Sequence, residues 1–382
     1  MSGKACLVGP AYPFRGGIAH FTTVLTGEFE KDHEVLVINF KRLYPSFLFP
    51  GKTQYDESKS PVAVESARTI DSLNPFSFRK TAKTIADFEP DLVVFQWWQP
   101  FFGVAYFLIL WFLKRFMREK PVSIVFLCHN VLPHESSPVD RWLIKTGFKQ
   151  ANSFLVHSKE DAANLEKLKK NVRVRVHPLP VFDMFRHGRY TKASAREALG
   201  VDGRVVLFFG LVREYKGLNI LLDGFAGCAD RIDATLMIVG EFYGGKDEYM
   251  ARIGKLGIED RVIVVDHYVP NEEVEKYFAA CDIVALPYLT ATQSAIVQVA
   301  YSFDKPVIVT RVGGLPDVVD DGVTGFVAPP RDPEAIGEAL VRFFETANAG
   351  EMEQNIKTAK DRFSWSGCKK ALLELAQADA DL

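Results

Sequence analysis

The chain has 382 residues, of which 48% are hydrophobic and 25% are charged. Such a composition excludes a disordered or low-complexity protein, and the length suits two or three globular domains. The net charge of -2 hides an asymmetry, because residues 1–180 carry 24 Lys and Arg against 17 Asp and Glu, whereas the rest carries 22 against 31. We therefore expect the first half to meet an anionic partner, although not a nucleic acid.

Short apolar runs that are typical of buried strands recur through the first half of the chain. Helical patterns at residues 18–29 and 76–88 lie between them. The predicted strands are residues 5–9, 34–40, 91–96, 122–127, 153–157 and 172–176. Strands that alternate with helices predict a parallel, doubly wound sheet.

The N-terminal sequence and the cysteines indicate the cellular compartment in which the protein is expected. The first predicted strand begins within a few residues of the N-terminus, so we expect no secretory signal. The cysteines are scattered, form no Cys-x-x-Cys pair and mostly lie in apolar surroundings; they are Cys6, Cys128, Cys228, Cys281 and Cys368. We expect a cytoplasmic protein with reduced, buried thiols.

The first strand leads into a turn that carries Gly16 and Gly17 directly before a helix. Glycine lets the backbone approach a ligand closely, so this turn is a candidate binding loop. A lone pair of glycines is equally typical of a plain tight turn. Both interpretations stay open at this point.

Residues 100–113 form an apolar run rich in aromatic side chains, preceded by Trp97 and Trp98 and followed by Lys114, Arg115 and Arg118. The run is shorter than the ~20 apolar residues that span a bilayer. Tryptophan beside a basic cluster suits an anionic membrane interface, so residues 100–118 are a candidate membrane-contact segment. The apolar residues 47–49 favour the same interpretation. The alternative is a helix buried in the core of the first domain.

The alternation of strands and helices restarts after a polar link at residues 187–193, with helices at 194–199, 333–345 and 365–376. The predicted strands of this half are residues 205–209, 235–239, 262–265, 283–286, 307–309 and 325–327. Two such sheets in tandem predict two domains that face a cleft. Ligands bind open α/β sheets at the carboxyl ends of the strands.

Between the strand at 204–209 and a helix at 218–225 lies a turn with Gly210, Arg213, Lys216 and Gly217. Two cations beside the free amides of a helix N-terminus suit a phosphate or a diphosphate. The alternative is solvated charge on a connecting loop. Later, Gln293, Ser294 and Ala295 open another helix, where amide donors are again free for an anion.

Together these motifs resemble the family-4 retaining glycosyltransferases, also described as glycosyl transferases group 1, which have the GT-B fold of two Rossmann-like domains. The resemblance covers nearly the whole chain. In chain order the matching motifs are Arg15-Gly16-Gly17, His129-Asn130, Val156-His157-Ser158, Gly210 with Lys216-Gly217, Val239-Gly240-Glu241, Lys305-Pro306 with Gly313-Gly314 and Asp317, and Phe363-Ser364-Trp365.

The resemblance implies an α/β chain with an acceptor-side domain at residues 1–185, a nucleotide-sugar-binding domain at 186–362 and a C-terminal helix at 363–382 that crosses back to the first domain. It implies transfer of a hexose from a nucleoside-diphosphate sugar with retention of configuration. The expected acceptor is a glycan or a lipid-linked glycan of cell-envelope polysaccharide synthesis, at the cytoplasmic face of the membrane.

No cofactor and no metal are expected, because Arg213, Lys216 and helix N-termini can stabilise the departing diphosphate. An Asp-x-Asp sequence at Asp379 and Asp381 follows no strand, and we interpret it as a solvated tail. The implied catalytic residues are His129, Arg213 and Lys216. The implied donor-binding residues are Gly16, Gly17, Gly210, Gly240, Gln293, Ser294, Ala295 and Gln298.

His129 follows a buried strand, and the resemblance places it at the donor sugar, where imidazole can hydrogen-bond a hydroxyl. The alternative is a histidine whose hydrogen bonds are satisfied within the core.

Two departures from the family pattern concern donor binding. The two glutamates of the family pattern are replaced by Ala291 and Val299, so that Gln293, Ser294 and Gln298 are the nearby polar substitutes. Leu211 stands where a phosphate-binding arginine is common.

These departures keep a second class of function open, a catalytically inactive GT-B scaffold or binding protein. An epimerase or a phosphorylase of the same fold is a further alternative. The sequence argues against a dehydrogenase, because no Gly-x-Gly-x-x-Gly follows the first strand with an acid at the end of the second strand.

Overall fold

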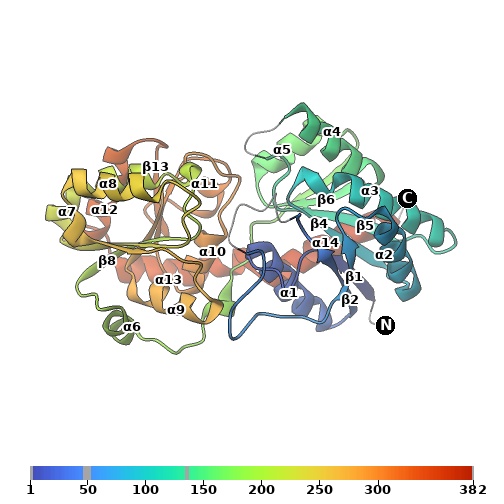
Figure 1. Ribbon diagram of the computed structural model, residues 1–382, viewed down its shortest axis with the longest axis horizontal. Helices are drawn as coiled ribbons and strands as arrows, with labels where there is room; N and C mark the ends of the chain where they lie inside the picture. Colours follow the sequence, from blue (N-terminus) through green and yellow to red (C-terminus); the bar gives the residue numbers. More distant parts are fainter. Residues whose placement is uncertain (1–2, 46–52, 134–136, 381–382) are drawn as a thin grey trace. The chain divides into compact units, whose positions relative to one another are not determined.

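A computed structural model describes residues 3–45, 53–133 and 137–380 of the chain (Figure 1). The described chain divides into two compact units. The first consists of the residues up to Glu57, Pro61–Pro178 and those from Phe363 onward, and the second of Ser58–Ser60 and Leu179–Arg362. Each unit is built on one parallel sheet with helices between its strands, which confirms the predicted α/β class. Residues 47–49 and Asp381 lie outside the described part.

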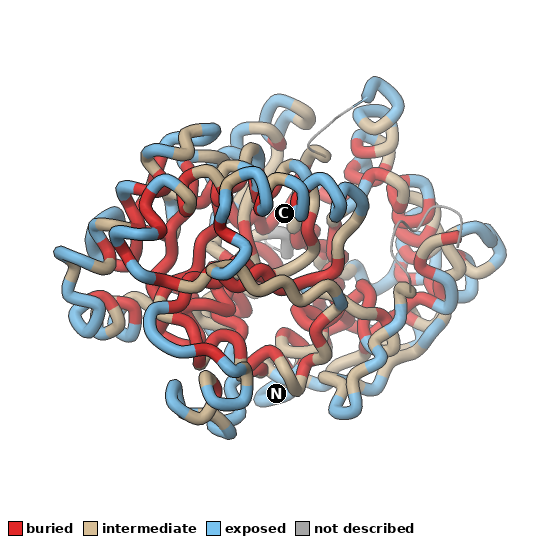
Figure 2. Tube along the Cα trace, turned by 60° about the vertical axis from the view of Figure 1, so that its left-hand side comes forward, coloured by how far each residue is buried: buried red, intermediate tan, exposed pale blue. Residues whose placement is uncertain are grey.

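The first unit contains a seven-stranded sheet in the order β3-β2-β1-β4-β5-β6-β7. Its strands are β1 (Lys4–Val8), β2 (Glu34–Arg42), β3 (Ala67–Asp71), β4 (Leu92–Trp97), β5 (Ser123–Cys128), β6 (Ser153–Val156) and β7 (Arg173–Val176). Its helices are α1 (Gly17–Glu30), α2 (Pro75–Phe88), α3 (Gly103–Phe116), α4 (Pro138–Gly147), α5 (Lys159–Leu168) and α14 (Trp365–Ala380), with short 3-10 turns η2 (Pro100–Phe102) and η3 (Phe148–Gln150). Strand β4 is buried along its whole length and β5 from Ile124 onward, and Figure 2 colours the buried parts of the chain red.

The second unit contains a six-stranded sheet in the order β10-β9-β8-β11-β12-β13. Its strands are β8 (Arg204–Phe209), β9 (Ala234–Val239), β10 (Val262–Val265), β11 (Ile283–Leu286), β12 (Val307–Thr310) and β13 (Gly325–Ala328). Its helices are α6 (Lys192–Leu199), α7 (Leu218–Ile232), α8 (Lys246–Leu256), α9 (Asn271–Ala280), α10 (Ala295–Ser302), α11 (Leu315–Val318), α12 (Pro333–Glu345) and α13 (Ala349–Ala359). Short 3-10 turns are η4 (Asp183–Phe185), η5 (Glu214–Lys216), η6 (Glu259–Arg261) and η7 (Lys360–Phe363).

The apolar run at residues 100–113 forms η2 and most of α3. One side of α3 lies in the core of the first unit, where Tyr106, Ile109 and Leu110 are fully buried. Trp97 is also buried, and Trp98 packs on Phe102 with ring centroids 4.5 Å apart. Trp97 therefore belongs to the interior, and Trp98 is half-buried against the same core. The opposite side of α3 leaves Trp111 41% exposed. No helix of the described residues is long and apolar enough to cross a bilayer.

The last helix, α14, belongs to the first unit although the whole second unit precedes it in the chain. The ammonium of Lys369 donates to the carbonyl oxygen of Glu28 at 3.1 Å and pairs with Asp32. The hydroxyl of Ser123 donates to the carbonyl oxygen of Ala376 at 2.9 Å. At the other crossing, the unit boundary lies at Pro178 rather than at 185, because η4 packs against α9 and α10 of the second unit.

Candidate active site

The second unit places the predicted cation turn directly after β8. Gly210 has φ 102° and Gly217 has φ 69°, values that L side chains rarely adopt. A Cβ on Gly217 would lie 2.0 Å from the carbonyl oxygen of Pro287, and one on Gly240 would lie 2.2 Å from that of Gly210. Close backbone packing therefore requires glycine at these positions. Because β8, β9 and β11 are parallel neighbours, the turns that follow them lie at one edge of the sheet.

Lys216 is the most unusual residue of this turn. It is only 9% exposed, and a Cβ on Gly210 would lie 3.1 Å from its Nζ atom. Burial, with a smaller effect of Arg213, lowers the pKa of Lys216 to about 8. Within the described residues no carboxylate forms an ion pair with Lys216. A buried cation without a counter-charge is costly, so its place favours an anionic ligand.

Arg213 stands at the start of η5, half-buried, with its guanidinium carbon 4.5 Å from the ring centroid of Tyr243. The Nζ atom of Lys216 lies 5.7 Å from the ring centroid of Tyr288. Aromatic faces thus lie beside both cations. The turn brings together the two cations that the sequence predicts for a diphosphate.

The α10 N-terminus follows β11 at the same edge of the sheet. Ser294 caps this helix by accepting a hydrogen bond from the Ile296 amide at 3.2 Å, and its hydroxyl lies 3.1 Å from that of Tyr288. Burial raises the pKa of Tyr288 well above its usual range, so the phenol stays protonated. Ala295 is the first residue of α10. Tyr288 was not among the predicted residues, and an aromatic residue two positions after a strand is the local signal for it.

Two glutamines, one just before this helix and one within it, have buried amide atoms without a hydrogen-bond partner in the described chain. They are Nε2 of Gln293 and Oε1 of Gln298, and Gln298 is only 1% exposed. An unpaired buried amide is destabilising unless a ligand or water satisfies it. Ala291 and Val299, which replace the family's glutamates, are also buried. Polar donor and acceptor capacity is therefore present on this helix without a carboxylate.

The first unit holds His129 directly after β5. Its amide donates to the carbonyl oxygen of Trp97 at 2.7 Å, and its Nε2 lies 2.8 Å from Oε1 of Gln96. Its ring contacts Phe21 at 4.8 Å and His157 at 5.4 Å between centroids. Burial, and to a lesser extent His157, holds the pKa of His129 well below its usual range, so the imidazole is neutral.

Gly16 and Gly17 lie at the N-terminus of α1, the helix that carries Phe21. Gly16 has φ 107°, and a Cβ on either glycine would meet nothing within 4 Å. No side chain caps this end of α1. Open space beside free helix amides is what a ligand-binding turn needs, so the binding interpretation keeps its physical basis.

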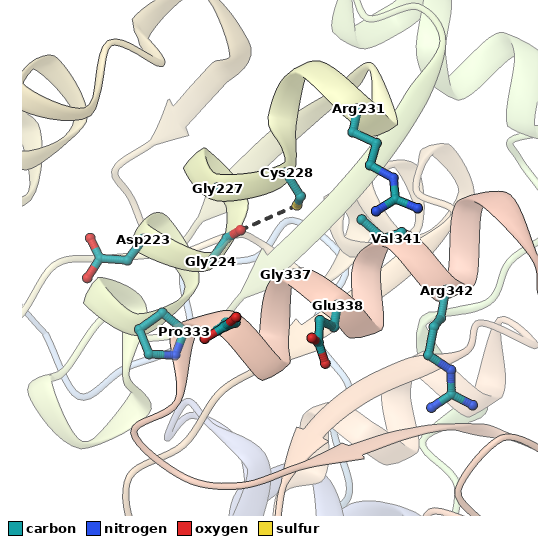
Figure 3. Close-up of a pocket in the computed structure, with 11 residues that line it drawn as sticks. Asp223, Gly224, Gly227, Cys228, Arg231, Pro333, Gly337, Glu338, Val341 and Arg342 are labelled. Atoms are coloured by element: carbon teal, nitrogen blue, oxygen red, sulfur yellow. Dashed lines mark hydrogen bonds between the residues drawn. The ribbon is translucent and has the colours of Figure 1, made fainter.

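A described groove lies elsewhere, between α7 and α12 of the second unit (Figure 3). The two helices cross closely at glycines, since a Cβ on Gly224 would lie 2.4 Å from the carbonyl oxygen of Pro333. None of the predicted site residues lines this groove. It is the flank of a helix crossing and not the site at the strand ends.

Within the described residues, no three His, Cys, Asp or Glu side chains gather as ligands of a metal ion. All five cysteines are free and buried, as the sequence predicts. Burial raises the pKa of the Cys228 thiol to about 11, which makes it unreactive.

Comparison with known proteins shows which families and folds the chain resembles. Residues 203–346 match the family described as Glycosyl transferases group 1. This match lies within the second unit. The D-inositol 3-phosphate glycosyltransferase of Corynebacterium glutamicum is 31% identical over 202 residues, 49% of this chain and 46% of the relative. The chain spans about half the length of the curated relatives it matches.

Solved structures show the fold of the whole chain. The complex of Anabaena HepE with UDP matches with a TM-score of 0.72 at 20% identity and covers 100% of both chains. A glycosyltransferase from Rickettsia africae matches with a TM-score of 0.73 at 15% identity and covers 99% of this chain and 98% of that one. The predicted GT-B fold is confirmed, whereas the assignment to family 4 stays a prediction.

Proposed function

We propose that the protein is a glycosyltransferase that moves a hexose from a nucleoside-diphosphate sugar to a hydroxyl of a glycan or lipid-linked acceptor. The observation that carries the proposal is Lys216, a buried cation without a carboxylate partner in the described chain, in a strand-to-helix turn of a group 1 domain. The named complexes of HepE contain UDP or UDP-glucose, which makes UDP the first nucleotide to test.

In this proposal Arg213 and Lys216 bind the diphosphate and stabilise the charge that grows on it as the sugar leaves. Preorganised donors in a buried site do this without reorganisation, and they supply the role a bound metal would otherwise have. The reaction we propose is metal-independent and retains the anomeric configuration. Nε2 of Gln293 and Oε1 of Gln298 are the free buried groups for donor hydroxyls. Neutral His129 accepts a hydroxyl hydrogen.

The test combines binding with turnover. We expect UDP, or GDP in its place, to raise the melting temperature of the purified protein, because a ligand of the native state stabilises it. Transfer from the matching nucleotide sugar in the presence of EDTA, followed by NMR of the product anomer, checks metal independence and retention. The acceptor panel includes lipid-linked glycans and an inositol phosphate. Nucleotide binding without transfer or donor hydrolysis would favour the scaffold alternative.

We further propose that the first unit docks on an anionic membrane surface through α3 and its neighbours. Helix α3 packs between α2 and α4. Across these helices Trp111 is 41% exposed and Trp142 is 60% exposed. The exposed cations around them are Lys80, Lys83, Lys114, Arg115, Arg141 and Lys145. Exposed tryptophan among cations suits the headgroup region of an anionic bilayer, and the acceptor would then be lipid-linked.

Vesicle flotation tests this contact. The protein should bind phosphatidylglycerol vesicles at low salt and release as salt rises. Combined Trp111→Glu, Lys114→Glu and Arg115→Glu should abolish binding, whereas Lys255→Glu on exposed α8 should not. If the wild-type protein does not bind these vesicles at low salt, the membrane contact is refuted and the proposed acceptor is a soluble glycan.

A further inference from the structure

A chain of hydrogen bonds inside the first unit ends on His129, and none of its other members was predicted as functional. It begins at Thr22, a fully buried residue of α1, and passes through Gln96, a fully buried residue of β4. Nε2 of Gln96 donates to Oγ1 of Thr22 at 2.6 Å, and Oε1 of Gln96 lies 2.8 Å from Nε2 of His129.

The direction of this chain follows from Thr22. Its hydroxyl has one hydrogen, and its other two partners are the carbonyl oxygens of Pro10 at 2.5 Å and Ile18 at 3.0 Å. Carbonyl oxygens only accept, so the hydroxyl donates to one of them and presents a lone pair to Gln96. The group of Gln96 that faces Thr22 is therefore the NH₂, and the group that faces His129 is the carbonyl oxygen.

A carbonyl oxygen facing Nε2 of His129 requires a hydrogen on that nitrogen. In the neutral imidazole the other nitrogen, Nδ1, then carries a lone pair. Nδ1 makes no hydrogen bond to any residue in the described chain. The amide orientation and the histidine tautomer, usually a matter of assignment, are both determined here by two backbone carbonyls.

Gly9, the residue directly after β1, makes room for this arrangement. A Cβ at Gly9 would lie 2.9 Å from Nε2 and 3.1 Å from Cδ of Gln96. Any larger residue would press on the amide that links Thr22 to His129. A glycine at a strand end is here required by a neighbouring side chain rather than by its own backbone angles.

We propose that Thr22 and Gln96 are positioning residues that hold His129 as the Nε2–H tautomer, so that Nδ1 accepts a hydrogen bond from a sugar hydroxyl. The tautomer follows from the hydrogen bonds alone, whereas the sugar hydroxyl rests on the proposed glycosyltransferase function. A protein with the opposite tautomer would present an N–H donor at Nδ1 and could not accept that hydrogen.

NMR of ¹⁵N-histidine-labelled protein tests the tautomer without any assay of activity. With His129→Gln used for assignment, wild-type His129 should give one protonated nitrogen, Nε2, and one unprotonated nitrogen, Nδ1. Thr22→Val removes the hydroxyl at nearly constant shape and lets the Gln96 amide turn, so His129 should populate both tautomers and show averaged ¹⁵N shifts. Thr22→Ser keeps the hydroxyl and should give the wild-type pattern. A proton on Nδ1 in the wild type, or an unchanged pattern in Thr22→Val, would overturn the proposal.

Thr26→Val is the matched control. Thr26 is also buried in α1, but its hydroxyl donates only to the carbonyl oxygen of Thr22, at 2.7 Å. This variant should keep the wild-type tautomer. If Thr22→Val does not fold, as judged by circular dichroism, Gln96→Met removes the acceptor at Nε2 from the other side and should likewise mix the tautomers. A single Nε2–H tautomer in folded Gln96→Met would then overturn the proposal.

Kinetics separate a positioning role from a merely structural one. Thr22→Val should lower kcat roughly tenfold with nucleotide affinity unchanged, Thr22→Ser should recover most of it, and Thr26→Val should retain it. An expected tautomer without any sugar transfer would refute the proposed function and leave the positioning role of Thr22 and Gln96 intact. Sugar transfer by the wild type, together with a His129 tautomer that Thr22→Val leaves unchanged, would support the proposed function and refute the positioning role of Thr22 and Gln96.

Discussion

The two units use the same local device, a strand followed by a glycine turn and a helix, under opposite physical conditions. In the second unit Gly217 and Gly240 are crowded by backbone carbonyls, and Gly210 lies against the ammonium of Lys216. In the first unit Gly16 and Gly17 border open space. Glycine is thus needed for packing in one turn, whereas in the other it leaves room for a ligand.

The candidate site residues of the two units also differ in charge. The second unit presents Arg213 and Lys216, whose positive charges suit a diphosphate. The first unit presents His129, which burial keeps uncharged. We infer that binding strength comes mainly from the second unit and that the first contributes to the chemical step. The predictions that follow test this division of labour.

The largest effect is expected from the cations of the second unit. Charge-assisted hydrogen bonds contribute about 1.5–3 kcal/mol each, so Arg213→Ala with Lys216→Ala should weaken UDP or GDP binding by roughly 10²- to 10⁴-fold. Calorimetry measures this directly, and exposed Lys255→Ala on α8 is the control for charge alone. Wild-type affinity in the double variant would place the diphosphate elsewhere.

His129→Ala should have a smaller effect, and on a different quantity. Turnover should fall by roughly 10²-fold, in the range of positioned polar groups, while nucleotide affinity stays at the wild-type value. Steady-state kinetics and calorimetry on the same preparation separate the two. The control is His187→Ala, an exposed histidine. Loss of nucleotide binding in His129→Ala would contradict the assignment of nucleotide binding to the second unit and of the chemical step to the first.

Glycine substitutions should separate stability from function. Gly217→Ala forces a strained φ and a clash with the carbonyl of Pro287, and should lower the free energy of unfolding by on the order of 3 kcal/mol. Gly17→Ala meets no atom and favours the helix, so it should add about 0.5–1 kcal/mol while lowering transfer activity. Denaturant unfolding and initial rates check both. Full activity in Gly17→Ala would make the first turn a plain tight turn.

The smallest effect concerns pH. Lys216 has its pKa lowered to about 8 by burial, so the unbound protein loses this charge as the pH rises through that value. If the diphosphate binds the protonated form, as proposed, its affinity should fall about fivefold between pH 8 and pH 9. Lys216→Arg, which keeps its charge, should flatten this dependence. Equal slopes in both proteins would show that another group titrates.

Much of this could be predicted from the sequence wherever the signal was local. Continuous apolar runs identified the buried strands, and glycines flanking cations identified the β8 turn. Strand β3 was missed because its sequence Ala67-Arg-Thr-Ile-Asp71 buries only Ile70. Trp97 was misinterpreted because an apolar run does not say which of its side chains face inward. The bond between Thr22 and Gln96 joins residues 74 positions apart, so no window of sequence reveals it.

The place of α14 bears on how the chain is made. Vectorial synthesis lets early domains fold as they emerge, yet the first unit here cannot bury Lys369 against Glu28 until the last helix has left the ribosome. The second unit, contained almost wholly in Leu179–Arg362, can finish sooner. The half that begins first therefore matures last, and a ribosome stalled before residue 365 would carry a completed second unit together with an incomplete first unit.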